Sequence, residues 1–279
     1  MTLTITPRAQ GLGAEVGGLD PRDASDADIA RLVAALAAHG VLVLRDQKLS
    51  PAELVQFSRR FGELEYHVLD QYWLPEEPLV YVISNVVENG RPIGNPREGF
   101  GWHTDLNYME RPTAVTFLLG LEVPPEGGET LFADAYGATD ALSLEERRHL
   151  TALSMKHSYA MLHASRPWAP PLTEEQKRRA PDVVHPLIRT HPETGRKGMY
   201  LGGPTCALPL GMGESQGLAL LHRLFERATE TRRVHAHRWR PGDLVFWDNR
   251  GVLHTATEYD RERHRRVVWR TSVRGERPF

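Results

Sequence analysis

Apolar residues near the N-terminus recur at helical spacing. Between Asp26 and Ala38 they lie three or four positions apart and leave a polar opposite face, which predicts an amphipathic helix. The tetrapeptide Ser50–Glu53 (Ser-Pro-Ala-Glu) combines a capping box with proline at the first helical position. It predicts a second helix through Phe61 that Gly62 closes, and a third helix is expected at about 215–229.

Short apolar and β-branched runs dominate the rest of the chain, and clusters of turn-forming residues such as 124–128 and 248–251 separate them. The predicted strands are Val41–Leu44, Leu79–Ile83, Ala114–Leu119, Thr130–Ala133, Leu153–Tyr159, Val183–Thr190, Val234–Trp239, Asp243–Trp247 and Val267–Val273. Many short strands punctuated by glycine and proline are typical of a sandwich or jelly roll, and not of a parallel α/β sheet. The sequence therefore predicts a mainly β jelly roll with flanking helices.

No repeat, low-complexity tract or linker divides the chain, so residues 1–279 are predicted to form a single domain. The region from about 162 to 182, which includes Arg166-Pro167-Trp168-Ala169-Pro170-Pro171, has the composition of a long insertion. Loops of this length in compact domains are often lids or binding loops, so we expect a lid-like insertion there.

The charge balance argues against nucleic acid or an anionic membrane as a partner. Lys and Arg total 34 against 36 Asp and Glu. The first residues lack a basic segment followed by an apolar run, and no stretch approaches the roughly 20 apolar residues of a membrane span. The single cysteine, Cys206, fits a reducing compartment, and without a base nearby it is interpreted as a small buried hydrophobe. We expect a cytoplasmic protein whose partners are small molecules or copies of itself.

His103-Thr104-Asp105 is a candidate metal motif. With 13 histidines in the chain, about one His-x-Asp is expected by chance, so the tripeptide alone is weak evidence and a surface hydrogen-bonded pair is the alternative. On a strand, residues two apart point to the same side, so the imidazole and the carboxylate could hold one ion. A third ligand must come from elsewhere, since two histidines and one carboxylate leave open positions on iron for a chelating oxoacid and oxygen.

Several separated motifs make this interpretation more specific. They are Gly101–Asp105, Pro124–Thr130, Phe246–Arg250, His254 and Arg266–Arg270. In this order and spacing they resemble the family of taurine dioxygenase and the phenoxyacetate-herbicide dioxygenases, from Phe61-Gly62 to the C-terminus. The resemblance implies a double-stranded β-helix. It also implies an Fe(II) enzyme with 2-oxoglutarate and O2 as co-substrates, which hydroxylates its substrate and releases succinate and CO2.

The resemblance assigns roles to five of the residues. It implies that His103, Asp105 and His254 bind the iron, and that Thr130 and Arg266 bind 2-oxoglutarate. The role of Arg266 has independent physical sense, because a guanidinium pairs bidentately with a carboxylate and stays charged when buried.

The spacing of the family leaves a doubt of one residue about the co-substrate arginine. Counted from His254, the usual spacing lands on Arg265. The family also pairs this arginine with a second one four residues on, and Arg266 with Arg270 satisfies that pattern. On a strand these two share a face while Arg265 points away, so we predict Arg266. The alternative is that residues 261–270 form a solvated basic face or a weak nucleic-acid patch.

The resemblance also points to the substrate. The position of Arg270 binds the anionic group of the substrate in relatives, and His67 matches a substrate-contacting histidine. A small anionic organic substrate follows, such as a sulfonate, a sulfate ester or an aryloxy or other carboxylic acid. Asp70 and Gly99 depart from the taurine enzyme and argue against taurine itself. The aromatic residues of 70–74 suggest a larger or aromatic substrate.

Asp105 also bears on the reaction, because related halogenases carry a small residue there. It favours hydroxylation, or cleavage that follows hydroxylation. Two further alternatives remain. A zinc-dependent hydrolase could use the same three ligands but would not need Arg266 or Thr130. A non-catalytic jelly-roll protein could use the arginines to bind an anion. The family resemblance further implies a homo-oligomer, a dimer or a tetramer.

Overall fold

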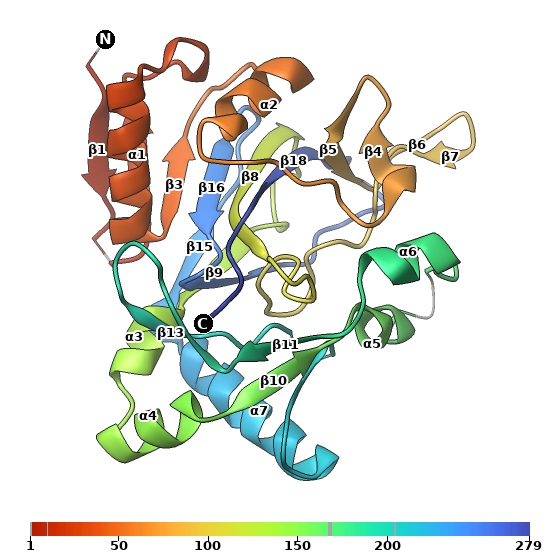
Figure 1. The fold of residues 1–279 in the computed structure, drawn as a ribbon. Coiled ribbons are helices and arrows are strands. Elements are labelled where there is room, and N and C mark those ends of the chain that lie inside the picture. The colour runs from red at the N-terminus through yellow and green to blue at the C-terminus, as the bar shows by residue number, and fades with distance from the viewer. Residues whose placement is uncertain (1, 10, 167–168, 204) are drawn as a thin grey trace.

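The computed structural model describes residues 2–9, 11–166, 169–203 and 205–279 (Figure 1). The α helices are α1 (Asp26–His39), α2 (Pro51–Arg59), α3 (Ala135–Asp140), α4 (Leu144–Thr151), α5 (Tyr159–Ala164), α6 (Glu174–Arg179) and α7 (Glu214–Ala228). Short 3-10 helices span Pro21–Asp23, Asp70–Tyr72 and Thr231–Arg233. Within the described part of the chain, none of these helices combines the length and apolarity needed to cross a membrane.

The strands form one large sheet and several small ones. They are β1 (Thr4–Pro7), β2 (Ala14–Gly17), β3 (Val41–Leu44), β4 (Trp73–Leu74), β5 (Glu77–Ser84), β6 (Val87–Glu88), β7 (Arg91–Pro92), β8 (Thr113–Glu122), β9 (Thr130–Asp134), β10 (Ser154–His157), β11 (Val183–Pro186), β12 (Ile188–Thr190), β13 (Lys197–Met199), β14 (Ala207–Pro209), β15 (Val234–His237), β16 (Leu244–Asp248), β17 (Val252–Ala256) and β18 (Val267–Arg274). The large sheet has the order β1-β2-β3-β16-β8-β18-β5-β4, and a small sheet has the order β15-β9-β17.

Both faces of the large sheet are covered. One apolar cluster joins its outer face to α1 and α2, with Leu32, Phe57 and Phe246 among its members. A second cluster joins its inner face to β9 and β17, through Phe132 and Val252. A third cluster packs α3, α4 and α7 against the far side of the small sheet. Figure 1 shows helices on both outer sides of the strands, so the predicted mainly β architecture with flanking helices is confirmed.

The sequence signals for the start of α2 are confirmed. Ser50 caps α2 through a capping box with Glu53, and Pro51 is the first helical residue, as predicted. The helix ends at Arg59, earlier than predicted, because Arg60 already forms its C-cap. Phe61 lies beyond the helix and still packs against the first cluster.

Two predicted strands were wrong in extent. The run Val183–Thr190 divides into β11 and β12, because the chain leaves β10 after Pro186 and pairs with β13 instead. The run Leu153–Tyr159 stops at His157, since the side chain of Ser158 accepts a hydrogen bond from the Met161 amide and starts α5.

Two other segments differ from the sequence prediction in ways that bear on function. Strand β17 was not predicted, although it carries His254. The insertion near 162–182 is not all loop, because α5 ends and α6 lies within it. Gln176 of α6 donates to Asp70 Oδ1 at 3.2 Å, so this insertion packs against the 70–74 segment. Residues 167 and 168 of the insertion lie outside the described residues.

Candidate metal centre and its two pockets

Two histidines that are far apart in the sequence lie side by side because their backbones form a bridge. The amides of His103 and His254 each donate to the carbonyl oxygen of the other residue, at 3.0 and 2.9 Å. Their ring centroids are 4.2 Å apart. The prediction that His103 and Asp105 lie on a strand is wrong. His103 forms only this isolated bridge, and Asp105 begins a turn in which Leu106 has a φ of 46°.

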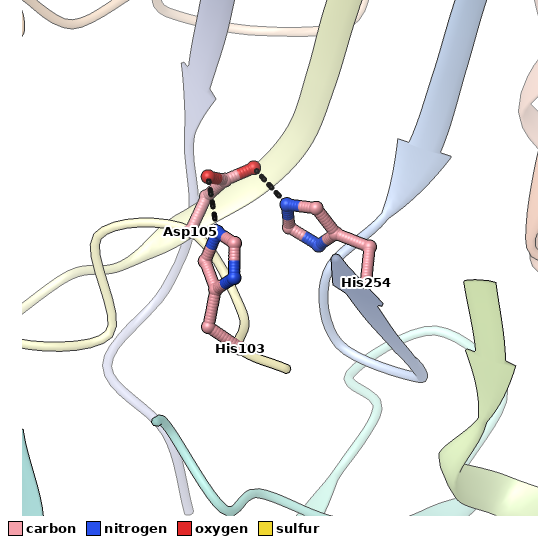
Figure 2. Close-up of side chains that lie close together, drawn as sticks. All are labelled: His103, Asp105 and His254. Carbon is pink, nitrogen blue, oxygen red and sulfur yellow. Dashed lines mark ion pairs between the residues drawn. The ribbon is translucent and has the colours of Figure 1, made fainter. Parts of the chain in front are cut away.

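The turn brings the Asp105 carboxylate to the two rings. Figure 2 shows the three side chains pointing toward one another. Asp105 Oδ1 lies 3.8 Å from His103 Nε2, and Oδ2 lies 3.5 Å from His254 Nε2. One ligand atom from each of the three residues lies within 4.8 Å of the others. Two imidazole nitrogens and one carboxylate oxygen at this separation suit a divalent metal and leave its other positions open.

A buried hydrogen-bond network orients Asp105. Thr116 Oγ1 donates to Asp105 Oδ2 at 2.6 Å and accepts from Asn249 Nδ2 at 2.9 Å. Asn249 Oδ1 in turn accepts from the Asp105 amide at 3.0 Å and from Trp247 Nε1 at 3.1 Å. Partners of this kind fix the direction of a ligand and tune its affinity for a metal. No sequence signal marks Thr116 for this role, and Trp247 and Asn249 stand out in the sequence only as part of the motif Phe246–Arg250.

The protonation states also suit a metal ligand set. His103 Nδ1 lies 2.6 Å from the Gly101 carbonyl oxygen, so Nδ1 carries the proton and Nε2 offers its lone pair. Burial, together with the neighbouring His254, lowers the pKa of His103 to about 4. Burial would raise the pKa of Asp105, but the Arg270 guanidinium above all holds it well below its usual range. At neutral pH His103 is therefore neutral and Asp105 is ionised.

A narrow pocket beside the triad contains Thr130 and Arg266. Arg266 is 6% exposed, and its Nε has no hydrogen-bond partner among the described residues. Burial lowers the pKa of Arg266 to about 10, so the side chain is still charged at neutral pH. The buried Thr130 Oγ1 accepts from Trp239 Nε1 at 3.0 Å, which leaves its hydroxyl hydrogen to donate elsewhere. A cation and a hydrogen-bond donor in this space could bind an anion. We call it the co-substrate pocket, after the role that the sequence predicts for Thr130 and Arg266.

The neighbouring Arg265 and Arg266, which directly precede β18, differ in exposure. Arg265 is exposed and pairs with Glu122, with Nε 2.7 Å from Oε2. Arg266 and Arg270 both line the co-substrate pocket, and Val268 between them is fully buried. The alternative that residues 261–270 form a solvated basic face is therefore wrong for the second half of this segment.

A larger pocket of about 120 Å³ adjoins the same triad, and we call it the substrate pocket. Its apolar and aromatic walls come from Phe100, Trp102, Leu106, Tyr108, Tyr159 and Leu162. The sequence prediction had placed aromatic surface at 70–74, which was wrong for this pocket. Trp73 packs against Tyr66 instead, with ring centroids 5.0 Å apart, and donates its Nε1 hydrogen to the His67 carbonyl oxygen.

His67 lies in the wall of the substrate pocket, and its side chain is 8% exposed. Burial, and after it the charge of Arg270, lowers the pKa of His67 to about 3, so the ring is neutral. His67 Nδ1 accepts a hydrogen bond from the Leu69 amide at 3.1 Å. Its proton therefore resides on Nε2, and this group can donate to a bound molecule.

Arg270 borders both pockets. Its Nη2 lies 3.1 Å from Asp105 Oδ1, so the guanidinium touches a predicted metal ligand. Burial would lower the pKa of Arg270, but the Asp105 and Glu98 carboxylates raise it. The cation is thus kept charged where an anion in either pocket could reach it.

Two charged residues of the substrate pocket were missed by the sequence analysis, which never considered Glu98 and quoted Arg166 only within the insertion. Their side chains form an ion pair, with Arg166 Nη1 3.7 Å from Glu98 Oε2. No motif signals such a pair, because the residues lie in two loops far apart in the sequence. Cys206 also lines this pocket and is buried, as predicted, and burial raises its pKa to about 11.

Comparison with known proteins identifies relatives of the whole chain. The family model described as "Taurine catabolism dioxygenase TauD, TfdA family" matches residues 4–272. Pentalenolactone F synthase of Streptomyces arenae is 36% identical, over 93% of this chain and 91% of the relative. The (S)-phenoxypropionate/alpha-ketoglutarate-dioxygenase of Sphingobium herbicidovorans is 32% identical, over 98% of this chain and 95% of the relative.

Solved structures agree with these sequence matches. The crystal structure of AAD-2 in complex with Mn(II) and N-oxalylglycine superimposes with a TM-score of 0.83 at 29% identity, and the match covers 100% of this chain and 99% of that one. The predicted double-stranded β-helix is confirmed by this likeness.

Proposed function

This chain belongs to the taurine dioxygenase (TauD, TfdA) family and is a 2-oxoglutarate-dependent dioxygenase, and on that premise we propose that it binds Fe(II) and hydroxylates a small anionic organic substrate. We assign the metal to His103, Asp105 and His254. We assign the co-substrate to Thr130 and Arg266, and the substrate to His67 and Arg270. Two imidazoles and one carboxylate are the ligand set that non-haem Fe(II) oxygenases use.

The observation that carries the proposal is the buried Arg266. A buried cation is costly unless an anion pairs with it, and no carboxylate of the described residues forms an ion pair with Arg266. Its guanidinium lines the same pocket as the metal triad and Thr130. The distal carboxylate of 2-oxoglutarate supplies the missing negative charge when the oxoacid binds the metal. N-oxalylglycine, which AAD-2 holds together with Mn(II), has the same two carboxylates as 2-oxoglutarate.

The protein residues bind, orient and shield the reactants. Arg266 and the Thr130 hydroxyl hold the co-substrate, and the Thr116–Asn249 network keeps the Asp105 carboxylate aimed at the metal. Arg270 binds the anionic group of the substrate, and the neutral His67 donates a hydrogen bond to it. When bound, iron with 2-oxoglutarate and O2 supplies the oxidation, in which the substrate gains one oxygen atom as hydroxyl and the oxoacid becomes succinate and CO2.

The substrate class follows from the pocket and from the relatives. The substrate pocket combines Arg270 with apolar and aromatic walls, which suits an organic acid. The printed names of relatives include dioxygenases for phenoxypropionate and for sulfonates. We propose that the substrate is a sulfonate, a sulfate ester, or an aryloxy or other carboxylic acid. The hydroxylated product is either released as such or breaks down into two fragments. We further propose that the chain acts as a single domain, with the 162–182 segment as a lid, in a cytoplasmic dimer or tetramer.

The test is anaerobic reconstitution of the full chain with Fe(II) and 2-oxoglutarate. We expect the weak visible charge-transfer band of the metal chelate, followed by oxygen-dependent succinate release with some members of a panel of sulfonates, sulfates and aryloxy acids. A chain that forms no band and releases no succinate, but hydrolyses esters with zinc, would be the zinc hydrolase instead. Anion binding with no turnover under any metal would indicate the non-catalytic alternative.

A further inference from the structure

The substrate pocket contains a second pair of charges that the proposed chemistry does not use. Glu98 and Arg166 both line this pocket, with 3.7 Å between Oε2 and Nη1, and Glu98 also borders the co-substrate pocket. Their side chains are only 11% and 17% exposed. Glu98 Oε2 also accepts from Asn95 Nδ2 at 2.5 Å and from the Tyr81 hydroxyl at 3.4 Å. Glu98 is thus held in place by its own neighbours, whereas Arg166 comes from the 162–182 segment.

Both members of this pair carry a full charge at neutral pH. Burial would raise the pKa of Glu98, but the Arg166 guanidinium first, and Arg270 further away, hold it below its usual value. Burial would likewise lower the pKa of Arg166, and the charge of Glu98 raises it instead. The pocket therefore holds a true ion pair.

The buried charges around the triad can be matched one by one. Under the proposed function, Arg266 pairs with the distal carboxylate of 2-oxoglutarate, and the metal dication is balanced by Asp105 and the other carboxylate of the oxoacid. Arg166 is already balanced by Glu98. Arg270, which pairs with Asp105 in this structure, is left with its charge available once Asp105 binds the metal. A buried site with one unmatched positive charge is completed by one negative charge.

We propose that Glu98 determines substrate specificity: by neutralising Arg166 it restricts the enzyme to substrates that carry a single negative charge. This inference rests on the proposed function of the site. A monoanion pairs with Arg270 and places its apolar remainder against walls such as Tyr108 and Tyr159. A second anionic group on the substrate would either lie beside the Glu98 carboxylate or take its place at Arg166. In the second case the Glu98 carboxylate would remain buried without a counter-ion. Either arrangement is unfavourable where water is excluded.

Glu98→Gln is the variant that removes this restriction. It keeps the shape and the contacts with Asn95 and Tyr81 but leaves Arg166 without a negative partner. A dianion can then satisfy both Arg270 and Arg166. The double variant Glu98→Gln/Arg166→Gln is the matched control, because the pocket again contains a single unmatched cation.

The experiment measures binding of phenoxyacetate and of 4-carboxyphenoxyacetate to the full chain loaded with Mn(II) and N-oxalylglycine, so that no turnover is needed. We expect the unmodified protein to bind the monoanion at least tenfold more tightly than the dianion. Glu98→Gln should reverse this preference, and the double variant should restore it. Arg166→Gln alone should weaken phenoxyacetate about tenfold, since Glu98 then opposes the anion, and this variant tests the pairing even if Glu98→Gln does not fold.

Failure of the inference and failure of the proposed function give different results. If Arg270→Gln abolishes phenoxyacetate binding but Glu98→Gln leaves the ratio of the two affinities unchanged, Glu98 does not determine specificity and the assignment of Arg270 still holds. If the chelate of 2-oxoglutarate forms but the unmodified protein binds neither probe, or binds both equally well, the inference is wrong. If no chelate forms at all, the proposed function is wrong and the inference fails with it.

Discussion

The two pockets that meet at the metal centre are built differently. The co-substrate pocket takes several polar groups from the two facing sheets: Thr130 lies in β9, His254 in β17, and Arg266 directly precedes β18. It shares Glu98, a loop residue, with the substrate pocket. The substrate pocket takes most of its wall from loops and from α5, including Glu98 and Arg166. Their charges differ as well. Arg266 has no counter-ion among the described residues, whereas Arg166 pairs with Glu98 and Arg270 pairs with Asp105.

This difference suggests that the two pockets of the site bind different kinds of ligand. A ligand common to every member of a family needs a fixed position, and strands buried in a packed core supply one. A ligand that differs between members is better held by loops, where a side chain can change without disturbing the sheets. The unmatched cation, Arg266, lies in the co-substrate pocket, whereas Arg166 lies in a loop of the substrate pocket and its partner Glu98 borders both pockets. The predictions below test this contrast, beginning at the triad that both pockets share.

Replacing His254 should have the largest effect, because it removes a proposed metal ligand on which both pockets depend. We expect His254→Ala to lower metal affinity by about 100-fold or more, measured by titration of the metal-free protein with Fe(II) under anaerobic conditions. His222→Ala is the matched control, since this histidine is exposed on α7. Equal metal affinity in the two variants would remove His254 from the ligand set.

The second prediction distinguishes the co-substrate pocket from the substrate pocket. Arg266→Ala should weaken 2-oxoglutarate by roughly 30-fold or more, since truncating one partner of a buried charged pair costs ~2–5 kcal/mol. Arg265→Ala should change it by less than about twofold, because an exposed pair such as Arg265–Glu122 contributes little.

The readout for this pair of variants is the chelate band as a function of 2-oxoglutarate concentration, with binding of the substrate measured separately. A larger loss for Arg265→Ala would show that the register predicted for β18 is wrong. A loss confined to the substrate would reverse the assignment of the two pockets.

Thr116→Val should have a smaller effect on the metal. The change removes the donor to Asp105 Oδ2 but retains the shape and every ligand atom. We expect metal affinity to fall by about 10-fold, in line with other groups that orient a metal ligand. Thr151→Val, at the exposed end of α4, serves as the control. Unchanged affinity in Thr116→Val would mean that the backbone turn alone positions the carboxylate.

The last prediction concerns the stability of the chain and not the binding of a ligand. Glu65 is buried, accepts a hydrogen bond from Thr113 at 2.8 Å, and burial raises its pKa to about 7. The ordinary value is lower, so the folded chain binds an extra proton between about pH 4.5 and 7. The stabilisation is therefore fully present below pH 4.5 and is lost as the pH rises through 7.

Glu65→Gln should remove this pH dependence and stabilise the chain at pH 8 by about 1–3 kcal/mol. The melting temperature of the metal-free protein at pH 5 and pH 8 provides the measurement, with the exposed Glu63→Gln as control. If both variants retain the slope of the unmodified protein, another group causes it.

Most helices and strands of the core could be predicted from the sequence, because the local signals and the tertiary packing agree. The capping boxes of Ser25 and Ser50 and the buried run Val41–Leu44 are consistent with the elements that they start or form. It failed for β17, whose stretch Val252–Ala256 is short and interrupted by polar residues. That strand forms because it pairs with β9, and such long-range pairing leaves no local pattern.

The same distinction applies to the site. The triad and the two arginines could be named from motifs, and the structure brings them to one place. The Thr116–Asn249 network and the Glu98–Arg166 pair could not, because each joins segments far apart in the sequence. The direction of the Asp105 side chain could not be predicted from the sequence either, because it depends on the turn at Leu106 and not on strand alternation.

The backbone bridge between His103 and His254 links the metal centre to the order in which the chain folds. His103 precedes β8, while His254 lies in β17 near the C-terminal end of the sequence, so the bridge joins two segments that are far apart in the chain. Such contacts between distant segments form late and slow the folding of β proteins. A metal that binds only the closed state stabilises it by mass action. The chain without the proposed metal is therefore expected to unfold more readily than the metal-bound chain.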